Sequence, residues 1–139
     1  MRVAANPSLY DPSPDIPVLH GVQCDHCARV YFPPMGIGCE MCGARAEQLL
    51  PTLLLAQGVV HAVAEVNLSP AAMPTPFTIA EIALDGGPLI RAMVHPESPG
   101  LQIGDRVVAR WNVVKHNDEG AEVVEPGFMA AVSSNGVQP

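Results

Sequence analysis

The sequence predicts an all-β protein in which an N-terminal rubredoxin-like zinc ribbon is followed by a five-stranded OB-fold barrel. Three observations support this fold class. All four cysteines form two Cys-x-x-Cys pairs near the start of the chain. The 139 residues include 15 prolines and 12 glycines, which divide the chain into pieces too short for long helices. Five apolar runs with strand-like composition follow the cysteines, separated by turn residues.

The length predicts one domain, or a small domain with an appendage, and is sufficient to bury a core without disulfides. We divide the chain into four parts by the position of the cysteines and the apolar runs. They are an N-terminal extension (1–20), the zinc ribbon (21–50), the OB-fold barrel (51–127) and a flexible tail (128–139).

The four cysteines have the spacing of a metal site. Cys24 and Cys27 form the first pair, eleven residues intervene, and Cys39 and Cys42 form the second pair. Two residues between thiols let a tight turn aim both sulfurs at one point, and two such turns complete a tetrahedron of Zn–S bonds of about 2.3 Å. Gly43, after the second pair, suits a turn with positive φ. We therefore predict these four residues as ligands of one structural metal ion.

Zinc is the favoured metal, and rubredoxin-type iron is the alternative. An iron electron carrier usually needs only the small metal domain, whereas about a hundred residues follow this ribbon. His26 lies between two ligands and is expected to be an exposed turn residue. The N-terminal residues show no signal-peptide run, and no segment has the roughly 18 apolar residues of a membrane span. We expect a cytoplasmic protein with reduced thiols, which favours metal over disulfides.

The apolar run "EQLLPTLLLAQ" after the ribbon predicts a connecting strand that is broken by Pro51. Turn residues at Asp85-Gly86 and Gly104-Asp105 indicate tight connections within the barrel. In the strand "RVVARWNVV", Trp111 alternates with small apolar residues and is expected in the barrel core. The five predicted barrel strands are 58–68, 77–84, 88–94, 106–114 and 121–126.

Three motifs follow one another over roughly residues 21–127. The ribbon motif is C-x2-C, FPP, then C-x2-CG, here Cys24, Cys27, Phe32-Pro33-Pro34, Cys39 and Cys42-Gly43. The barrel motif is present as Gly58-Val59, Pro76-Phe77, Ala80 and Leu84-Asp85-Gly86-Gly87-Pro88. The third motif, L-x-I-G-x-x-V, is present as Leu101, Ile103, Gly104 and Val107. Together and in this order, the three motifs resemble those of the DUF35 family of zinc-ribbon/OB-fold proteins.

This resemblance implies an acyl-CoA-associated accessory subunit in lipid metabolism. Family members usually partner thiolase-fold enzymes, such as thiolases and lipid-transfer-protein-like aldolases, and the partner carries the catalytic cysteine or histidine. The accessory protein scaffolds this hetero-oligomer and helps to hold the pantetheine arm of a CoA thioester. Many members carry a helical segment before the ribbon, whereas this chain has a short proline-rich one.

No catalytic residue is predicted. The chain lacks G-x-S-x-G, H-E-x-x-H and a phosphate-binding glycine loop. Glu65 and Glu81 are the one possible carboxylate pair, and solvated strand faces commonly carry such residues. The five histidines are spread singly and are expected on the surface or in loops: His20, His26, His61, His95 and His116.

Two residues are candidate contacts for the cofactor. Arg91, in the third predicted barrel strand, is a candidate partner for a CoA phosphate or for a carboxylate of the partner enzyme. Phe77, with Met73 and the surrounding prolines, is a candidate apolar docking patch. A solvated strand face for Arg91 and an internally packed loop around Phe77 are the alternatives.

Nucleic-acid binding is the second functional hypothesis, because ribbons and OB barrels both serve it. The net charge of −7 and the 4% of aromatic residues argue against it, and we predict neither a nucleic-acid nor a membrane partner. An iron-based redox protein is the third. The basic residues are scattered singly along the chain: Arg2, Arg29, Arg45, Arg91, Arg106, Arg110 and Lys115.

Overall fold

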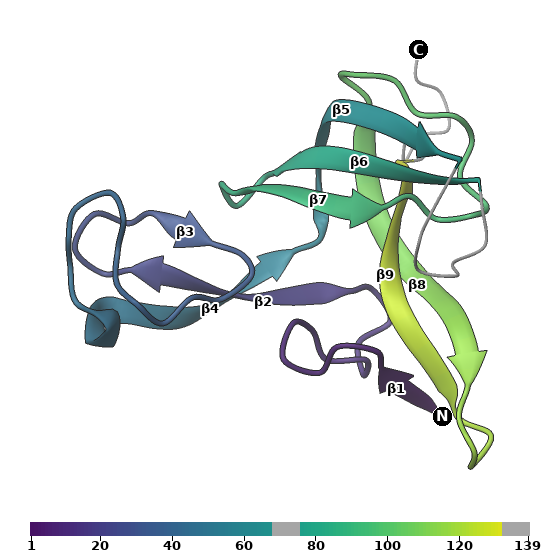
Figure 1. The fold of residues 1–139 in the computed structure, drawn as a ribbon, viewed down its shortest axis with the longest axis horizontal. Helices are drawn as coiled ribbons and strands as arrows, with labels where there is room; N and C mark the ends of the chain where they lie inside the picture. The colour runs from purple at the N-terminus through teal and green to yellow at the C-terminus, as the bar shows by residue number, and fades with distance from the viewer. Residues whose placement is uncertain (68–75, 132–139) are drawn as a thin grey trace.

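The structure is a computed structural model that describes residues 1–67 and 76–131. It contains a three-stranded ribbon sheet with the order β3-β2-β4 and a curled six-stranded sheet with the order β1-β9-β8-β5-β6-β7 (Figure 1). The one helical element among the described residues is a single 3-10 turn, η1 (Ala46–Gln48). The predicted all-β fold, a zinc ribbon followed by a five-stranded OB-fold barrel, is confirmed as a ribbon followed by an OB-like half-barrel, whose curled sheet has six strands.

All five predicted barrel strands are present, and the last two are longer than predicted. In the ribbon sheet the strands are β2 (Val18–Cys24), β3 (Val30–Tyr31) and β4 (Leu49–Leu55). In the six-stranded sheet they are β1 (Arg2–Ala4), β5 (Gln57–Val66), β6 (Phe77–Leu84), β7 (Leu89–Met93), β8 (Arg106–His116) and β9 (Glu122–Ala130).

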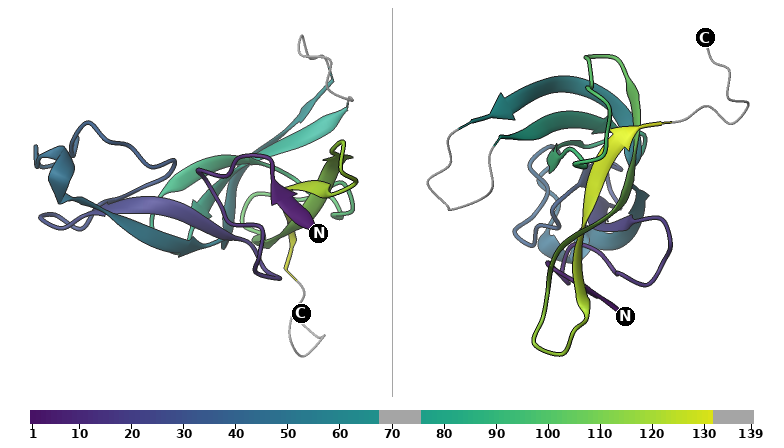
Figure 2. Two further views of the ribbon diagram at one scale, coloured as in Figure 1. Left: turned by 90° about the horizontal axis from the view of Figure 1, so that it is seen from below. Right: turned by 90° about the vertical axis from the view of Figure 1, so that its right-hand side faces the viewer.

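The barrel core forms on the concave side of the curled sheet, which is seen nearly end-on in Figure 2. Alternate residues of each strand face inward, as their apolar periodicity requires. Phe128 is the largest fully buried side chain, and its backbone bridges to Val94 beside β7, which brings the two sides of the sheet together. Trp111 is half-buried against this cluster, as predicted. Val113, two residues further along β8, is exposed because the β8–β9 hairpin extends beyond the barrel (Figure 1).

The ribbon sheet extends away from the barrel (Figure 1), and its strand β2 ends at Cys24, the first of the four cysteines. β2 and β4 pair antiparallel along seven residue pairs from Val18↔Leu55 to Cys24↔Leu49. The expected break at Pro51 does not occur, since Pro51 lies within β4 and faces Val22. β4 is the edge of its sheet, where a residue without an N–H can be accommodated because no second neighbour requires that donor.

Both ends of the chain contribute more to the fold than the predicted boundaries allow. β1 pairs parallel with β9, and Tyr10 is buried, so part of the segment 1–20 belongs to the barrel. The tail does not begin at 128, since β9 continues to Ala130 and Phe128 is only 1% exposed. Sequence separation hid the first contact, and the last predicted strand, 121–126, ended four residues before β9 does. Residues 132–139 of the predicted tail lie outside the described residues.

Candidate metal centre

The four cysteine sulfurs lie together at the end of the ribbon. All four lie within 4.8 Å of one another. The Sγ atoms of Cys24 and Cys42 are 3.6 Å apart, and those of Cys27 and Cys39 are 3.5 Å apart. A tetrahedron of Zn–S bonds of about 2.3 Å has S–S edges of about 3.8 Å. The distances therefore fit four thiolates around one metal ion and exceed by far the roughly 2.05 Å of a disulfide.

Two turns with the same hydrogen bonds position these sulfurs. In the first, the N–H of Ala28 donates to the carbonyl of Cys24 at 2.8 Å, and in the second the N–H of Gly43 donates to that of Cys39 at 3.0 Å. Ala28 has φ 69° and Gly43 has φ 78°, so both turns close through a left-handed residue. The sequence predicted this conformation at Gly43, and Ala28 adopts it as well.

The electrostatics of the cluster favour a cation. The phenol of Tyr31 lies 3.3 Å from the Sγ of Cys39, and this hydrogen bond lowers the pKa of Cys39 to about 6. For Cys42, the N–H of Ala44 lowers the pKa, but desolvation and the neighbouring thiols outweigh it and raise the pKa to about 12. Thiolates this close repel one another, and a bound divalent cation removes the conflict by holding all of them deprotonated.

The centre is partly enclosed by its own chain: two of its cysteines are buried, Cys27 is half-buried and Cys42 is exposed. Cys24 is fully buried and Cys39 is 4% exposed, and both belong to a small apolar cluster with Val22, Tyr31 and Leu49. With four protein ligands, a tetrahedral ion has no position for substrate. The cysteines thus form a zinc-ribbon-like metal-binding site of the structural kind.

The predicted cofactor contacts are not brought together. Arg91 is exposed on β7 and forms an ion pair with Glu81 at 3.1 Å. Phe77 is half-buried at the start of β6, four residues before Glu81, a distance along the strand of about 13 Å. Met73, the other member of the predicted patch, lies outside the described residues.

The remaining candidates for catalysis are also separate. Glu65 faces Thr78 across the β5–β6 ladder, so it does not pair with Glu81. His95 is held in a loop, where its Nε2 lies 3.2 Å from the carbonyl of Trp111 and its Nδ1 accepts the N–H of Glu97. Within residues 1–67 and 76–131, no histidine joins a group of three possible metal ligands.

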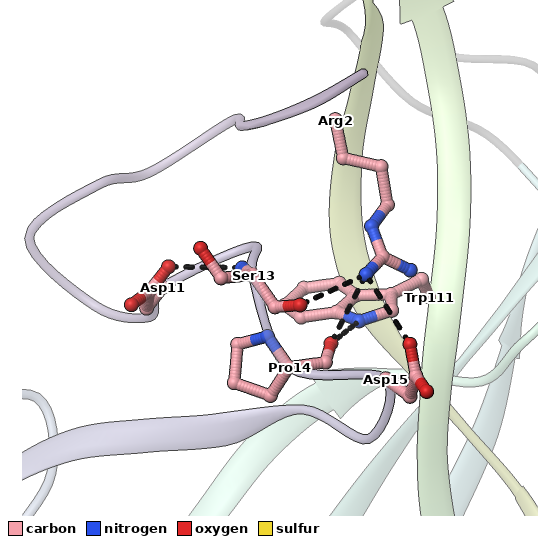
Figure 3. Close-up of polar contacts among 6 residues, drawn as sticks. All are labelled: Arg2, Asp11, Ser13, Pro14, Asp15 and Trp111. Atoms are coloured by element: carbon pink, nitrogen blue, oxygen red, sulfur yellow. Dashed lines mark hydrogen bonds and ion pairs between the residues drawn. The ribbon is translucent and has the colours of Figure 1, made fainter.

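Two features were missed by sequence reasoning. One is the contact between Tyr31 and Cys39, for which a tyrosine four residues beyond the first Cys-x-x-Cys pair is too weak a signal. The other is the cover that the N-terminal segment forms over Trp111 (Figure 3). The indole N–H of Trp111 donates to the carbonyl of Pro14 at 2.7 Å, and the guanidinium of Arg2 lies 5.6 Å from the ring centroid.

Comparison with known proteins locates similarity in both the ribbon and the fold. Residues 14–47 match the family model described as ChsH2, rubredoxin-like zinc ribbon domain. A chain of the solved Ltp2-ChsH2(DUF35) aldolase has the same fold, with a TM-score of 0.62 and 24% sequence identity, covering 82% of this chain and 85% of that one. No curated protein matches the sequence. A search of the described residues for a long apolar helix that could cross a membrane found none.

Proposed function

We propose that this chain, a DUF35-family protein by its matched ribbon and its shared fold, is the non-catalytic accessory subunit of a thiolase-like enzyme. The observation that carries the proposal is the fold shared with the solved Ltp2-ChsH2(DUF35) aldolase across 82% of the chain. The name of that aldolase joins a DUF35 protein with a second component. Partnership with a thiolase-like subunit is the function that best fits this likeness.

No catalytic group is assembled in the described part of the chain, which supports a complex in which the partner subunit performs catalysis and this chain has a structural role. Among the described residues, the four cysteines are the one group of three or more possible metal ligands, and in this proposal every thiol binds the metal. The partner then supplies the catalytic cysteine or histidine. In this proposal the bound ion, zinc, supplies structure, and this chain's residues position the ribbon.

A supporting role toward an acyl-CoA or acyl thioester is the finer part of the proposal. Arg91 is the candidate for a CoA phosphate, because its guanidinium is solvent-exposed at the rim of β7. To bind phosphate it must exchange its ion pair with Glu81, and such exposed pairs contribute only about 0.2–1 kcal/mol. Phe77 is the candidate for an apolar contact in this role.

We place the proposed complex in the cytoplasm.

Co-expression with the thiolase-fold protein encoded nearest to this chain's gene tests the proposal. We expect the two chains to co-elute in size-exclusion chromatography, with one zinc per copy of this chain in metal analysis. Separate elution of two folded proteins would contradict the accessory role. A red protein with stoichiometric iron would contradict the assignment of zinc.

A further inference from the structure

An apolar, unpaired strand edge lies on the ribbon. β4 pairs with β2 on one side and has no strand on its other side in the described part of the chain. Leu53 is 70% exposed, Leu55 is 59% exposed and Leu50 is 47% exposed. Proteins usually protect such an edge with charge, a bulge or a covering segment, because it invites pairing with another chain.

β4 carries one proline, but its pairing with β2 contains no bulge and no further strand covers its outer edge among the described residues. Residues 49–55 carry no charge. Pro51, Leu53 and Leu55 alternate along the strand and therefore point to one face of the sheet. On this face a groove of about 460 Å³ runs along Pro51, Thr52 and Leu53 toward His20 and Pro34. This face therefore combines exposed leucine side chains with an open groove.

Pro51 also determines which backbone groups point outward. Because proline has no N–H, its position in the ladder with β2 is one that does not require a bond to Val22. In an antiparallel ladder the outward and inward positions alternate, so Leu53 and Leu55 direct their N–H and C=O groups away from β2, as Pro51 directs its carbonyl. The exposed leucines are thus the residues whose backbone is free for an added strand.

The other sheet edges are poorer platforms. β3 consists of two residues, Val30 and Tyr31. The edge strand β7 is five residues long, and it carries the exposed ion pair between Arg91 and Glu81 of β6. β1, the remaining edge, has only three residues, so β4 is the long, uncharged and apolar edge among the four.

A second copy of this chain is a worse occupant than a different protein. In a symmetric antiparallel pairing of two β4 strands, both copies bring Pro51 to the new ladder, and each proline leaves a carbonyl of the other copy without its donor. Two copies that each carry a net charge of −7 also repel one another. When the added strand belongs to a protein of different sequence, the new ladder contains Pro51 only once, so only one carbonyl lacks its donor.

We propose that β4 is the docking strand of this protein, and that its occupant is an extended segment of the thiolase-like subunit added to the ribbon sheet. The inference rests on the proposed function and identifies the surface through which the accessory subunit would bind its partner. Main-chain hydrogen bonds at Leu53 and Leu55 supply affinity, and the apolar face and its groove supply specificity.

Two lysine substitutions, at residues of similar exposure, test this surface in the co-expressed complex. Leu53→Lys places a charge on the docking strand, and Ile103→Lys, at a residue 72% exposed on a barrel loop, is the matched control. We expect Leu53→Lys to weaken binding of the thiolase-fold subunit by at least about tenfold, as loss of a central apolar contact does. We expect Ile103→Lys to bind like the unmodified chain. Zinc content and circular dichroism check that both variants fold.

Amide hydrogen exchange of the unmodified chain tests the strand pairing without a variant. We expect slower exchange at Leu53 and Leu55 when the partner is added. Normal binding by Leu53→Lys together with unchanged exchange would overturn the docking strand and leave the accessory role standing. Failure of the unmodified chain to bind would overturn both proposals. A free chain that is dimeric, and that Leu53→Lys converts to a monomer, would assign β4 to a second copy and overturn the proposed occupant.

Discussion

Ala28 is the residue at which the metal centre departs from ideal turn chemistry. It holds φ 69°, in the left-handed region, so that its N–H can donate to the carbonyl of Cys24 at 2.8 Å. A side chain with a Cβ pays about 1–2 kcal/mol in this conformation. Gly43, at the equivalent position of the second turn, avoids that cost at φ 78°.

Replacing Ala28 with glycine is therefore expected to stabilise the metal-bound protein. The gain is up to about 1 kcal/mol, the left-handed penalty less the extra freedom of glycine in the unfolded chain. Gly43→Ala is the reverse control and is expected to destabilise by a similar amount. Urea denaturation at a fixed metal concentration measures both changes. A less stable Ala28→Gly variant would show that the turn depends on the methyl group.

Glu125 is a half-buried carboxyl, and burial raises its pKa above the ordinary value. A raised folded-state pKa means that the folded protein favours the protonated acid. The associated stability is present below the unfolded pKa and is lost as pH rises through the folded pKa.

Glu125→Gln removes this titration. We expect the variant to be more stable than the unmodified protein at pH 7. The difference should shrink as pH falls through the raised folded-state pKa and should be largely gone below the ordinary value of 4.5. Thermal unfolding from pH 3.5 to 7.5 measures it, and Glu65→Gln, at an exposed position of β5, is the control. An equal difference at both pH extremes would assign the effect to something other than proton binding.

At the element scale, the N-terminal segment acts as a cover for the barrel. Trp111 donates its indole N–H to the carbonyl of Pro14, and Arg2 donates to the carbonyls of Ser13 and Pro14 at 3.1 and 3.3 Å (Figure 3). The ring of Tyr10 lies 5.6 Å from that of Trp111. These contacts join a proline-rich stretch, which forms no long element of its own, to the middle of β8.

Trp111→Phe tests this cover by removing the indole N–H while keeping an aromatic side chain. We expect a loss of about 1 kcal/mol from the missing hydrogen bond, together with some lost packing. Chemical denaturation followed by circular dichroism measures the stability. Faster proteolysis within residues 1–14 is the accompanying sign that the segment has loosened, and unchanged stability with unchanged cleavage would contradict this role.

The elements that the sequence predicts well are those with local signals. The barrel strands from β5 to β9 have apolar alternation and are bounded by turns such as Asp85-Gly86, so their positions could be predicted within a few residues. β1 could not, because three residues carry no periodicity and its partner, β9, lies more than a hundred residues away. The strand break predicted at Pro51 was wrong, because whether a strand tolerates proline depends on its place in the sheet. That place is set by the tertiary structure and cannot be read from the local sequence.

The candidate site divides in the same way. The spacing of the four cysteines was sufficient to place them around one point. The contact of Tyr31 with Cys39 depends on how β3 lies against the second turn, which spacing does not encode. Arg91 was proposed as a cation in the third predicted barrel strand, and Phe77 as an apolar residue beside Met73 and prolines. The distance between them is set by strand register, which neither signal encodes.

At the scale of the whole molecule, the described residues form two apolar clusters, which differ in what stabilises them. The ribbon cluster consists of a few residues around Cys24 and Cys39, whereas the barrel cluster is larger and also takes in Leu19 and Leu54 from the roots of β2 and β4. A cluster as small as that of the ribbon is expected to depend on its metal.

Removal of the metal is therefore expected to unfold the end of the ribbon and leave the barrel folded. After chelation under reducing conditions, amide signals of residues 24–48 should collapse toward unfolded positions, while those of β5, β6 and β8 keep their dispersion. Nuclear magnetic resonance spectra recorded before chelation, after chelation and after zinc is added back measure this change in amide dispersion. Cys42→Ser should reproduce the chelated state, and loss of all dispersed signals would show that ribbon and barrel fold as one unit.

The placement of Trp111 also gives the molecule a built-in optical probe. It is the one tryptophan in the chain, and it lies beneath the N-terminal segment. Of the two tyrosines, Tyr31 touches the metal-binding end of the ribbon and Tyr10 lies beside Trp111. In an unlabelled sample, indole fluorescence therefore reports whether the N-terminal segment detaches from Trp111. The absorbance of Tyr31 reports changes at the cysteines. The two changes can thus be followed separately in one sample.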